Sequence, residues 1–359
     1  MSLFDQMTEY GHERVLFHHD ADTGLRAIIA VHSTALGNAL GGTRRWHYAT
    51  EADAIYDVLR LSQGMTYKAA CAGLQMGGAK SVIMLPKRGH QATEAEAQAM
   101  GRFVDTLSGA YIAAEDVGVD TQFVDWMASE TNHVMGGVTV STGGDPSPFT
   151  AQGVVNGIKA SLQHVNGSGD FNGVTVAVQG LGSVGSKVGR IVSELGAKVI
   201  AADINEVATR QAAEEFGATI VSVDEILTVE CDVLAPCALG GVIDANLAQK
   251  LRCRILCGGA NNILDDPDED AVLLRNQGVL YAPDFVVNAG GLIRLAGLYL
   301  GMTEAQVDQK VAEIEETTAT ILKDSESHAS THAAAIALAN RRIATGRAAN
   351  VGSSKLATA

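Results

Sequence analysis

Residues 174–203 read VTVAVQGLGSVGSKVGRIVSELGAKVIAAD. The apolar run 174–178 predicts a buried strand, and it is followed by Gly180-Leu181-Gly182-Ser183-Val184-Gly185 and then by a helical stretch at 187–195. A second apolar run, 198–202, ends in Asp203. Strand, glycine loop, helix and acidic strand end in this order are typical of a Rossmann βαβ unit. The stretch therefore predicts a doubly wound α/β domain.

The three glycines of this loop have separate physical tasks. Gly180 permits the turn, Gly182 allows the backbone to approach a pyrophosphate, and Gly185 allows the helix to pack close to the strand. The free N–H groups at the helix start then face the phosphates, and Asp203 accepts hydrogen bonds from ribose hydroxyls. We expect a dinucleotide such as NAD to bind here.

A second informative stretch, residues 64–85, reads GMTYKAACAGLQMGGAKSVIML and holds Lys68 and Lys80 among apolar and small residues. An ammonium group without a partner is costly in apolar surroundings. Gly77 and Gly78 predict a tight turn before an apolar strand at 82–85, which places Lys80 where a loop enters a strand. That position suits a catalytic group, but two snorkelling lysines with solvated heads explain the same residues equally well.

The rest of the chain alternates strand and helix patterns. Thr50 and Thr93 begin predicted helices with capping signals, and the predicted strand 111–114 ends at the acidic pair Glu115-Asp116. This pair is a candidate site, although surface carboxylates are the commoner case. A cluster of glycine and proline at 143–148 predicts a domain boundary. Further strands are predicted at 14–17, 27–31, 233–237, 255–259 and 279–283, and helices follow from Thr303.

Composition narrows the class of protein. The chain has 359 residues, enough for two domains, and a formal net charge of −15, which argues against nucleic acid or an anionic membrane as partner. We find no membrane-length apolar run and no signal peptide, so we expect a cytoplasmic protein. The five cysteines form no Cys-x-x-Cys pair. We therefore expect free thiols and no metal site.

Several motifs, taken in order, resemble the amino-acid dehydrogenase family that includes glutamate, leucine, phenylalanine and valine dehydrogenases, and they are most similar to those of the leucine enzymes. The resemblance covers nearly the whole chain. The motifs are Leu40-Gly41-Gly42-Thr43-Arg44, Gly64-Met65-Thr66-Tyr67-Lys68, Gly77-Gly78-Ala79-Lys80, Glu115-Asp116-Val117-Gly118, Asp145-Pro146-Ser147-Pro148, the Gly180 loop, Ala235-Pro236-Cys237-Ala238, Gly259-Ala260-Asn261-Asn262, and Tyr281-Ala282-Pro283-Asp284 with Asn288-Ala289-Gly290-Gly291.

The resemblance implies a reversible oxidative deamination, in which an L-amino acid and NAD give a 2-oxo acid, ammonium and NADH. By motif position, Lys80 is the general base and acid, Asp116 assists proton transfer, and Lys68 holds the substrate carboxylate. Burial and the neighbouring charge of Lys68 are expected to lower the pKa of Lys80. The other implied substrate-binding residues are Leu40, Gly41, Gly42, Met65, Ala114, Asn262, Leu292 and Leu295. The implied cofactor-binding residues are Thr150, Gly180, Leu181, Gly182, Ser183, Val184, Gly185, Asp203, Cys237, Ala238, Asn262 and Asn288.

The positions that resemble the side-chain pocket are all apolar. They include no lysine or arginine to meet a second carboxylate, which disfavours glutamate as substrate. Leu40 and Ala114 resemble the leucine enzymes, so we expect leucine, valine or isoleucine, with a phenylalanine-type enzyme as the alternative. The chain departs from the family pattern at Ala79, Met135, Leu292, Arg294 and Leu295, and these departures leave the preferred amino acid open.

The resemblance also implies an architecture. We expect a substrate-binding, catalytic and oligomerisation domain at 1–145, a Rossmann domain at 146–330, and a helical segment at 331–359 that returns to the first domain. A homo-oligomer, either a dimer or an octamer, is expected. One rival is a 2-hydroxy acid dehydrogenase, but that chemistry usually needs a His–carboxylate pair, and no histidine lies in a glycine-rich stretch. Another is an inactive NAD-binding regulator, which the joint presence of Lys68, Lys80 and Asp116 disfavours.

Overall fold

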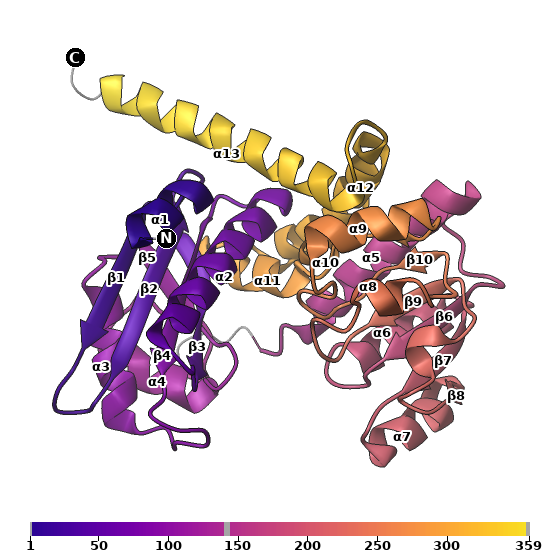
Figure 1. Cartoon of the computed structure of the whole chain (residues 1–359), viewed down its shortest axis with the longest axis horizontal. Coiled ribbons are helices and arrows are strands. Elements are labelled where there is room, and N and C mark those ends of the chain that lie inside the picture. The colour runs from indigo at the N-terminus through magenta and orange to yellow at the C-terminus, as the bar shows by residue number, and fades with distance from the viewer. Residues whose placement is uncertain (1, 140–143, 357–359) are drawn as a thin grey trace. The chain divides into compact units, whose positions relative to one another are not determined.

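The computed structural model describes residues 2–139 and 144–356, with side chains as far as residue 349. The described residues divide into two compact units. The first comprises the described part of 1–144 together with 295–301 and 339–356, and the second comprises 145–294 and 302–338. Each unit contains one β-sheet (Figure 1). The predicted two-domain α/β architecture is confirmed.

The first unit is built on a five-stranded mixed sheet with the strand order β1-β2-β4-β3-β5. Strands β1, β2 and β4 pair in antiparallel fashion, whereas β3 runs parallel to both β4 and β5. Figure 1 shows the long helix α2 alongside these strands. The elements are α1 (Leu3–Tyr10), β1 (Arg14–His19), β2 (Arg26–Ser33), β3 (Ala39–Trp46), α2 (Glu51–Cys71), β4 (Gly77–Met84), α3 (Glu94–Asp105), β5 (Tyr111–Ala114) and α4 (Thr121–Ala128).

Alternating side chains give this sheet two buried faces. On β2, Ile28 packs in a cluster with Val58 and Leu59 of α2, while Ile29 packs in the cluster that contains residues of α3 and α4. The helix predicted from Thr50 is confirmed: its side chain and that of Asp53 form a capping box. Because α2 continues to Cys71, Lys68 lies in the last turn of this helix.

The tight turn predicted at Gly77 and Gly78 is wrong, because both glycines lie within β4. Both positions require glycine because backbone atoms of other segments come close. A Cβ atom on Gly77 would lie 2.0 Å from the Ser33 carbonyl oxygen, and one on Gly78 would lie 2.1 Å from the backbone nitrogen of Thr66 in α2. Gly77 thus allows the end of β2 to approach β4, and Gly78 allows α2 to pack directly on this strand. Lys80 is therefore in the middle of a central strand.

The second unit is built on a six-stranded parallel sheet with the order β11-β10-β9-β6-β7-β8. With β6 as the first strand, this is the doubly wound order 3-2-1-4-5-6 read from β8. The elements are α5 (Ser147–Asn166), β6 (Thr175–Gln179), α6 (Gly185–Glu194), β7 (Lys198–Ala202), α7 (Glu206–Phe216), β8 (Thr219–Ile220), η1 (Ile226–Thr228), β9 (Val233–Pro236), α8 (Ala245–Ala248), β10 (Ile255–Leu256), α9 (Pro267–Asn276), β11 (Leu280–Tyr281), α10 (Asp284–Val287), α11 (Gly290–Tyr299), α12 (Glu304–Asp324), η2 (Ser325–Ser327) and α13 (Thr331–Leu356). Helices α11 and α13 each contribute residues to both units.

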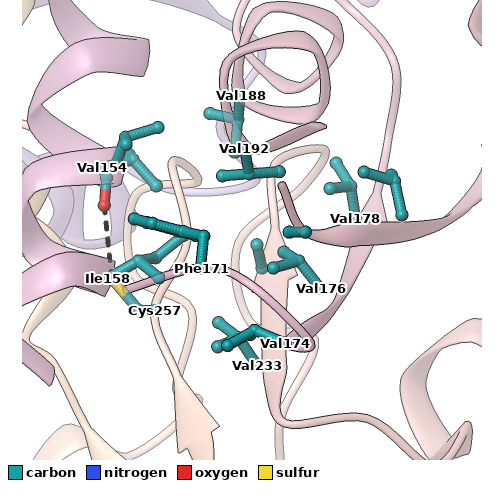
Figure 2. Packing of buried hydrophobic residues seen from close by; sticks show 14 of the residues in the cluster. Val154, Ile158, Phe171, Val174, Val176, Val178, Val188, Val192, Val233 and Cys257 are labelled. Carbon is teal, nitrogen blue, oxygen red and sulfur yellow. Dashed lines mark hydrogen bonds between the residues drawn. The ribbon is translucent and has the colours of Figure 1, made fainter. Parts of the chain in front are cut away.

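One face of this sheet carries the apolar core shown in Figure 2. Side chains of α5, α6 and β6 pack together there, and the Cys257 thiol donates a hydrogen bond of 3.7 Å to the Val154 carbonyl oxygen. The labelled members of the cluster are Val154, Ile158, Phe171, Val174, Val176, Val178, Val188, Val192, Val233 and Cys257. This packing fixes β6 and α6, the two elements that flank the Gly180 loop.

The C-terminal helix returns to the first unit, as predicted. Arg342 of α13 donates from Nη1 to the carbonyl oxygens of Ala70 and Cys71, at 2.7 and 2.6 Å. These carbonyls end α2, where a cation is favoured by the helix dipole. In the described part of the chain, no helix is long and apolar enough to cross a membrane.

A buried histidine gives the first unit a predictable pH dependence. Burial and the neighbouring His32 lower the pKa of His12 from its ordinary 6.5 to about 4. His12 Nε2 lies 2.8 Å from Ser62 Oγ and 3.1 Å from the Leu59 carbonyl oxygen, so the ring connects the segment before β1 to α2. The folded state holds His12 neutral while the unfolded state binds a proton below pH 6.5, so stability falls as pH decreases from 6.5 towards 4.

We predict that His12→Gln weakens this dependence, because glutamine keeps a donor near Ser62 but cannot be protonated. At 1.36 kcal/mol per pKa unit, the shift corresponds to about 3 kcal/mol at most. Denaturant unfolding of both proteins at pH 7 and pH 5 measures the difference. Equal losses of unfolding free energy in the two proteins would contradict the assignment.

Candidate active site

The side chain of Lys80 is buried in the first unit. It is 5% exposed and lies on β4 between β2 and β3. Side chains on a strand alternate, so Lys80 is on the same face of the sheet as Val82, which packs in the α2 cluster. Burial without a charged partner would be prohibitive for an ammonium group.

Asp116, two residues beyond the end of β5, supplies that partner. Its Oδ2 lies 3.1 Å from Lys80 Nζ and accepts a hydrogen bond of 2.9 Å from Arg44 Nε. The side chains of Arg44 and Asp116 are about one-fifth exposed, at 22% and 21%. One carboxylate oxygen thus joins two cations from two neighbouring strands, β4 and β3.

These charges shift the pKa values of the catalytic candidates. Burial lowers the pKa of Lys80; the positive charge of Arg44 lowers it further, and Asp116 opposes the shift. Burial alone would raise the pKa of Asp116, but Lys80 and Arg44 outweigh burial and hold it below its ordinary value. The result is an ionised carboxylate beside a lysine that gives up its proton more readily than a solvated one.

Arg44 is a cation that acts on Lys80 and that the sequence did not predict in this role. Its positive charge lowers the pKa of Lys80. The expected effect of Lys68 on the same pKa stays a prediction. In the sequence, Arg44 stands out only as part of a family motif, and nothing local indicates a role for Asp57. In the structure, Asp57 Oδ2 accepts hydrogen bonds of 3.0 Å from Arg44 Nη1 and 2.7 Å from the Tyr48 hydroxyl. Many sequences have an arginine on a strand and an aspartate on the helix that follows. This pattern alone therefore does not predict the network.

Two glycines of β3 make room for the pair. A Cβ atom on Gly42 would lie 2.8 Å from the Cβ of Asp116 and 3.1 Å from Lys80 Nζ, and one on Gly41 would lie 1.7 Å from the Ala79 carbonyl oxygen. A side chain at either position would displace the ion pair or its strand. The glycines therefore leave the room in which Lys80 and Asp116 meet.

The remaining substrate-binding candidates are divided between the units. Leu40 and Ala114 are buried on adjacent strands β3 and β5, and Met65 and Lys68 are half-buried on α2, which covers β4. The Met135 N–H donates to the Ala113 carbonyl oxygen, which places this residue beside β5. Leu295 belongs to the first unit, whereas Asn262 and Leu292 belong to the second.

The Gly180 loop in the second unit has the shape that a dinucleotide needs. Gly180 has a φ of +90°, and its missing Cβ would lie 2.6 Å from the Cβ of Ala238. A Cβ on Gly185 would lie 1.9 Å from the Gly180 carbonyl oxygen, so the turn requires glycine at both positions. Gly182 is exposed and has nothing within 4 Å of a Cβ position, which leaves space above its backbone. Helix α6 starts here with no side-chain cap, and an uncapped helix start favours the binding of an anion such as a phosphate.

Asp203 lies against the same loop. Its Oδ2 accepts a hydrogen bond of 2.6 Å from the Leu181 N–H and its Oδ1 one of 2.7 Å from the Asn205 N–H. The half-buried carboxylate therefore fixes the loop and ends the strand β7. Ser183 and Val184 complete the turn before α6, with Ser183 exposed.

The other cofactor candidates come from loops around the same sheet. Asn288 donates from Nδ2 to Asn261 Oδ1 at 2.9 Å, while its Oδ1 is buried with no hydrogen-bond partner in the described part of the chain. Thr150 Oγ1 accepts a hydrogen bond from the Gly291 N–H at 3.1 Å. Asn262 is exposed with a φ of +52°. An unsatisfied amide oxygen, an open glycine and an uncapped helix start fit a bound dinucleotide.

Cysteines and metal ligands add no further site. Burial raises the pKa of the half-buried Cys237 thiol to about 11, so this residue is an uncharged neighbour of the loop. Ala238 is exposed beside Gly180. Among the described residues, no group of three or more His, Cys, Asp or Glu side chains is placed to hold a metal ion.

Three family models match this chain. The first, described as Glu/Leu/Phe/Val dehydrogenase, dimerisation domain, matches residues 12–133. The second, Glutamate/Leucine/Phenylalanine/Valine dehydrogenase, matches 202–351. The third, D-isomer specific 2-hydroxyacid dehydrogenase, NAD binding domain, matches 151–239. Together they imply a nicotinamide cofactor on the second unit.

Individual relatives are similar over nearly their whole length. A leucine dehydrogenase from Bacillus cereus is 42% identical over 346 residues, which cover 96% of this chain and 94% of that enzyme. A valine dehydrogenase from Streptomyces albus is 39% identical and covers 94% of each chain. The crystal structure of an L-tryptophan dehydrogenase from Nostoc punctiforme superposes with a TM-score of 0.86 at 38% identity, covering 96% of this chain and 99% of that one.

Two glycines of the loop give a matched test of cofactor binding. We predict that Gly182→Val leaves thermal stability nearly unchanged, because the position is open, but weakens NADH binding by at least about tenfold, because the side chain fills the space for the phosphates. Gly185→Val, in contrast, should destabilise the second unit, since its Cβ meets the Gly180 carbonyl. Thermal melts and titration of NADH fluorescence separate the two effects. Tight NADH binding by Gly182→Val would show that the phosphates bind elsewhere.

Proposed function

This chain belongs to the Glu/Leu/Phe/Val dehydrogenase family, and on that premise we propose that it catalyses the NAD-dependent, reversible oxidative deamination of an aliphatic L-amino acid. The products are the 2-oxo acid, ammonium and NADH. The observation that carries the proposal is the buried Lys80–Asp116 ion pair, in which burial and Arg44 lower the pKa of the lysine.

Bound NAD would supply the acceptor for the hydride of the substrate Cα, and residues of this chain move the protons. Neutral Lys80 would take a proton from the water that adds to the iminium carbon and give it to the nitrogen. Lys80, neutral again, would then take the proton of the new hydroxyl group as the C=O bond forms and ammonia departs. Asp116, kept ionised by its two cations, exchanges protons with the amino group. Lys68 holds the substrate carboxylate as a point charge. The lowered pKa of Lys80 suits it to act in both directions.

NAD rather than NADP is the proposed cofactor. Asp203 would repel a 2′-phosphate, and the next residues, Ile204 and Asn205, offer no cation. In the proposed complex the Gly180 loop and the start of α6 hold the pyrophosphate, and Asp203 accepts from the ribose. Thr150 and Asn288 lie on the nicotinamide side, where the free Oδ1 of Asn288 can accept from the carboxamide.

A branched aliphatic side chain is the proposed substrate specificity. Leu40 and Ala114 are apolar and buried close to Lys80 on neighbouring strands. Among the departures from the family pattern, Arg294 has a structural explanation: it pairs with Glu304 at 3.1 Å and stacks over Phe149 at 5.0 Å. The names of the relatives include leucine, valine and tryptophan enzymes, so an aromatic substrate is the alternative.

A 2-hydroxy acid dehydrogenase is the second candidate, because one such family model matches 151–239. That match lies entirely within the second unit and says nothing about Lys80 and Asp116 in the first. We therefore favour the amino-acid reaction.

A homo-oligomer, dimer or octamer, is also proposed, since the family model over 12–133 is described as a dimerisation domain. Cytoplasmic location stays a prediction from the sequence.

The proposal is tested by a screen of the common L-amino acids with NAD and with NADP, followed by absorbance of the reduced cofactor. Leucine, valine and isoleucine should be the best substrates and differ modestly, because one methylene in an apolar pocket is worth about 1–3 kcal/mol. NAD should be preferred. In reverse, NADH oxidation with a 2-oxo acid should require ammonium. Oxidation without ammonium would establish the hydroxy acid reaction instead, and a preference for phenylalanine or tryptophan would reject the proposed pocket.

Two lysine variants separate proton transfer from substrate binding. Lys80→Ala should lower kcat by at least about a hundredfold while NADH still binds, because general acid–base catalysis is worth 10²–10⁴-fold. Lys68→Ala should mainly raise the KM for the amino acid, because it removes the charged anchor. Steady-state kinetics and NADH titration measure both. Substantial turnover by Lys80→Ala, or an unchanged KM in Lys68→Ala, would contradict the respective role.

A further inference from the structure

Arg44 and Lys80, the proposed general base, bind the same carboxylate, that of Asp116. Arg44 Nε donates to Asp116 Oδ2 at 2.9 Å, and Lys80 Nζ lies 3.1 Å from the same oxygen. No side chain or backbone donor in the described part of the chain forms a hydrogen bond with the other oxygen, Oδ1. The carboxylate is therefore held at one oxygen and open at the other.

Arg44 is itself anchored on its far side by helix α2. Its Nη1 lies 3.0 Å from Asp57 Oδ2, and the Tyr48 hydroxyl donates to that same oxygen at 2.7 Å. The Asp57 side chain is only 16% exposed. A guanidinium presents donors in a fixed fork, so one arginine can bind both carboxylates at once, which an ammonium group cannot do with the same geometry.

We propose that Arg44 is a positioning residue for the reaction: clamped by Asp57 and Tyr48, it holds the Asp116 carboxylate by Oδ2 so that Oδ1 faces the substrate amino group and Lys80 keeps its place. This inference rests on the proposed function and deepens it. Arg44 touches neither the substrate nor the cofactor in this role; it acts through Asp116 and through its charge.

The charge of Arg44 has a second consequence. The charged and titratable groups that act on Lys80 include Asp116 beyond β5, Arg44 on β3 and Asp57 on α2, with Tyr48 and Arg60 in contact with Asp57. Lys68 is a further cation on α2, the helix that packs on β4, and both variants below retain it. The positive charge of Arg44 lowers the pKa of Lys80. Without it, the ammonium form of Lys80 is favoured, and the enzyme needs a higher pH to generate the neutral base.

The test compares Arg44→Met with Arg60→Met. Both variants lose one positive charge and one contact with Asp57, because Arg60 Nη2 lies 3.4 Å from Asp57 Oδ1, but only Arg44 binds Asp116. Arg44→Met should lower kcat at least about tenfold, change the amino-acid KM less than threefold, and move the rising limb of the kcat/KM–pH profile to higher pH. Arg60→Met should leave all three near the wild-type values. Arg44→Lys should restore the pH profile but not the full kcat.

Each outcome decides a separate question. A wild-type protein without ammonium-dependent NADH oxidation rejects the proposed function. An active wild type with Arg44→Met within twofold in kcat and an unmoved profile rejects the positioning role, as does an equal effect of Arg60→Met. If circular dichroism shows that Arg44→Met does not fold, Asp57→Asn and Tyr48→Phe take its place. Both loosen the clamp while keeping Arg44 and should lower kcat with NADH affinity unchanged; no effect in either rejects the inference.

Discussion

The first unit is arranged around an ammonium group buried in the middle of a sheet. Lys80 is 5% exposed on a central strand, a position that β-sheets normally give to apolar residues. Its charge is tolerated because Asp116 lies 3.1 Å away, and this distance requires the end of β5 to come close to β4. The glycine at position 42 follows from the same requirement, since any side chain there would meet both partners.

Helix α2 links this ion pair to the proposed substrate anchor. Asp57 and Lys68 are separated by 68 − 57 = 11 residues on α2, and about 100° per residue brings them back to nearly the same face of the helix. Asp57 clamps Arg44 against Asp116, while Lys68 lies one turn from the end of the helix that Arg342 caps. Since Gly78 allows α2 to contact β4 directly, a shift of α2 would disturb both ends of the site.

The features that were predicted correctly from the sequence depend on residues that lie close together along the chain. The Gly180 loop, its flanking strand and helix, and Asp203 all lie within about thirty residues, and their spacing reflects one turn of backbone. The Thr50 helix start was equally readable from its capping box. A turn at Gly77-Gly78 was predicted incorrectly, and the contacts of Arg44 and Asp57 were not predicted at all. Both failures have the same cause. These residues are defined by contacts with segments far along the chain, which no local period encodes.

The two units have different proposed tasks, so a similarity of one unit to a known family says less about the reaction than a similarity of the other. A Rossmann sheet with a glycine loop serves many reactions, and accordingly a hydroxy acid dehydrogenase model matches this part of the chain. The groups proposed to distinguish the chemistry are in the first unit, where Asp116 forms ion pairs with both Lys80 and Arg44. In the proposed reaction, the cofactor site would fix where a hydride goes, and the charge network would determine which proton can move. For this reason the substrate class is better inferred from β3, β4 and β5 than from the strands of the second unit.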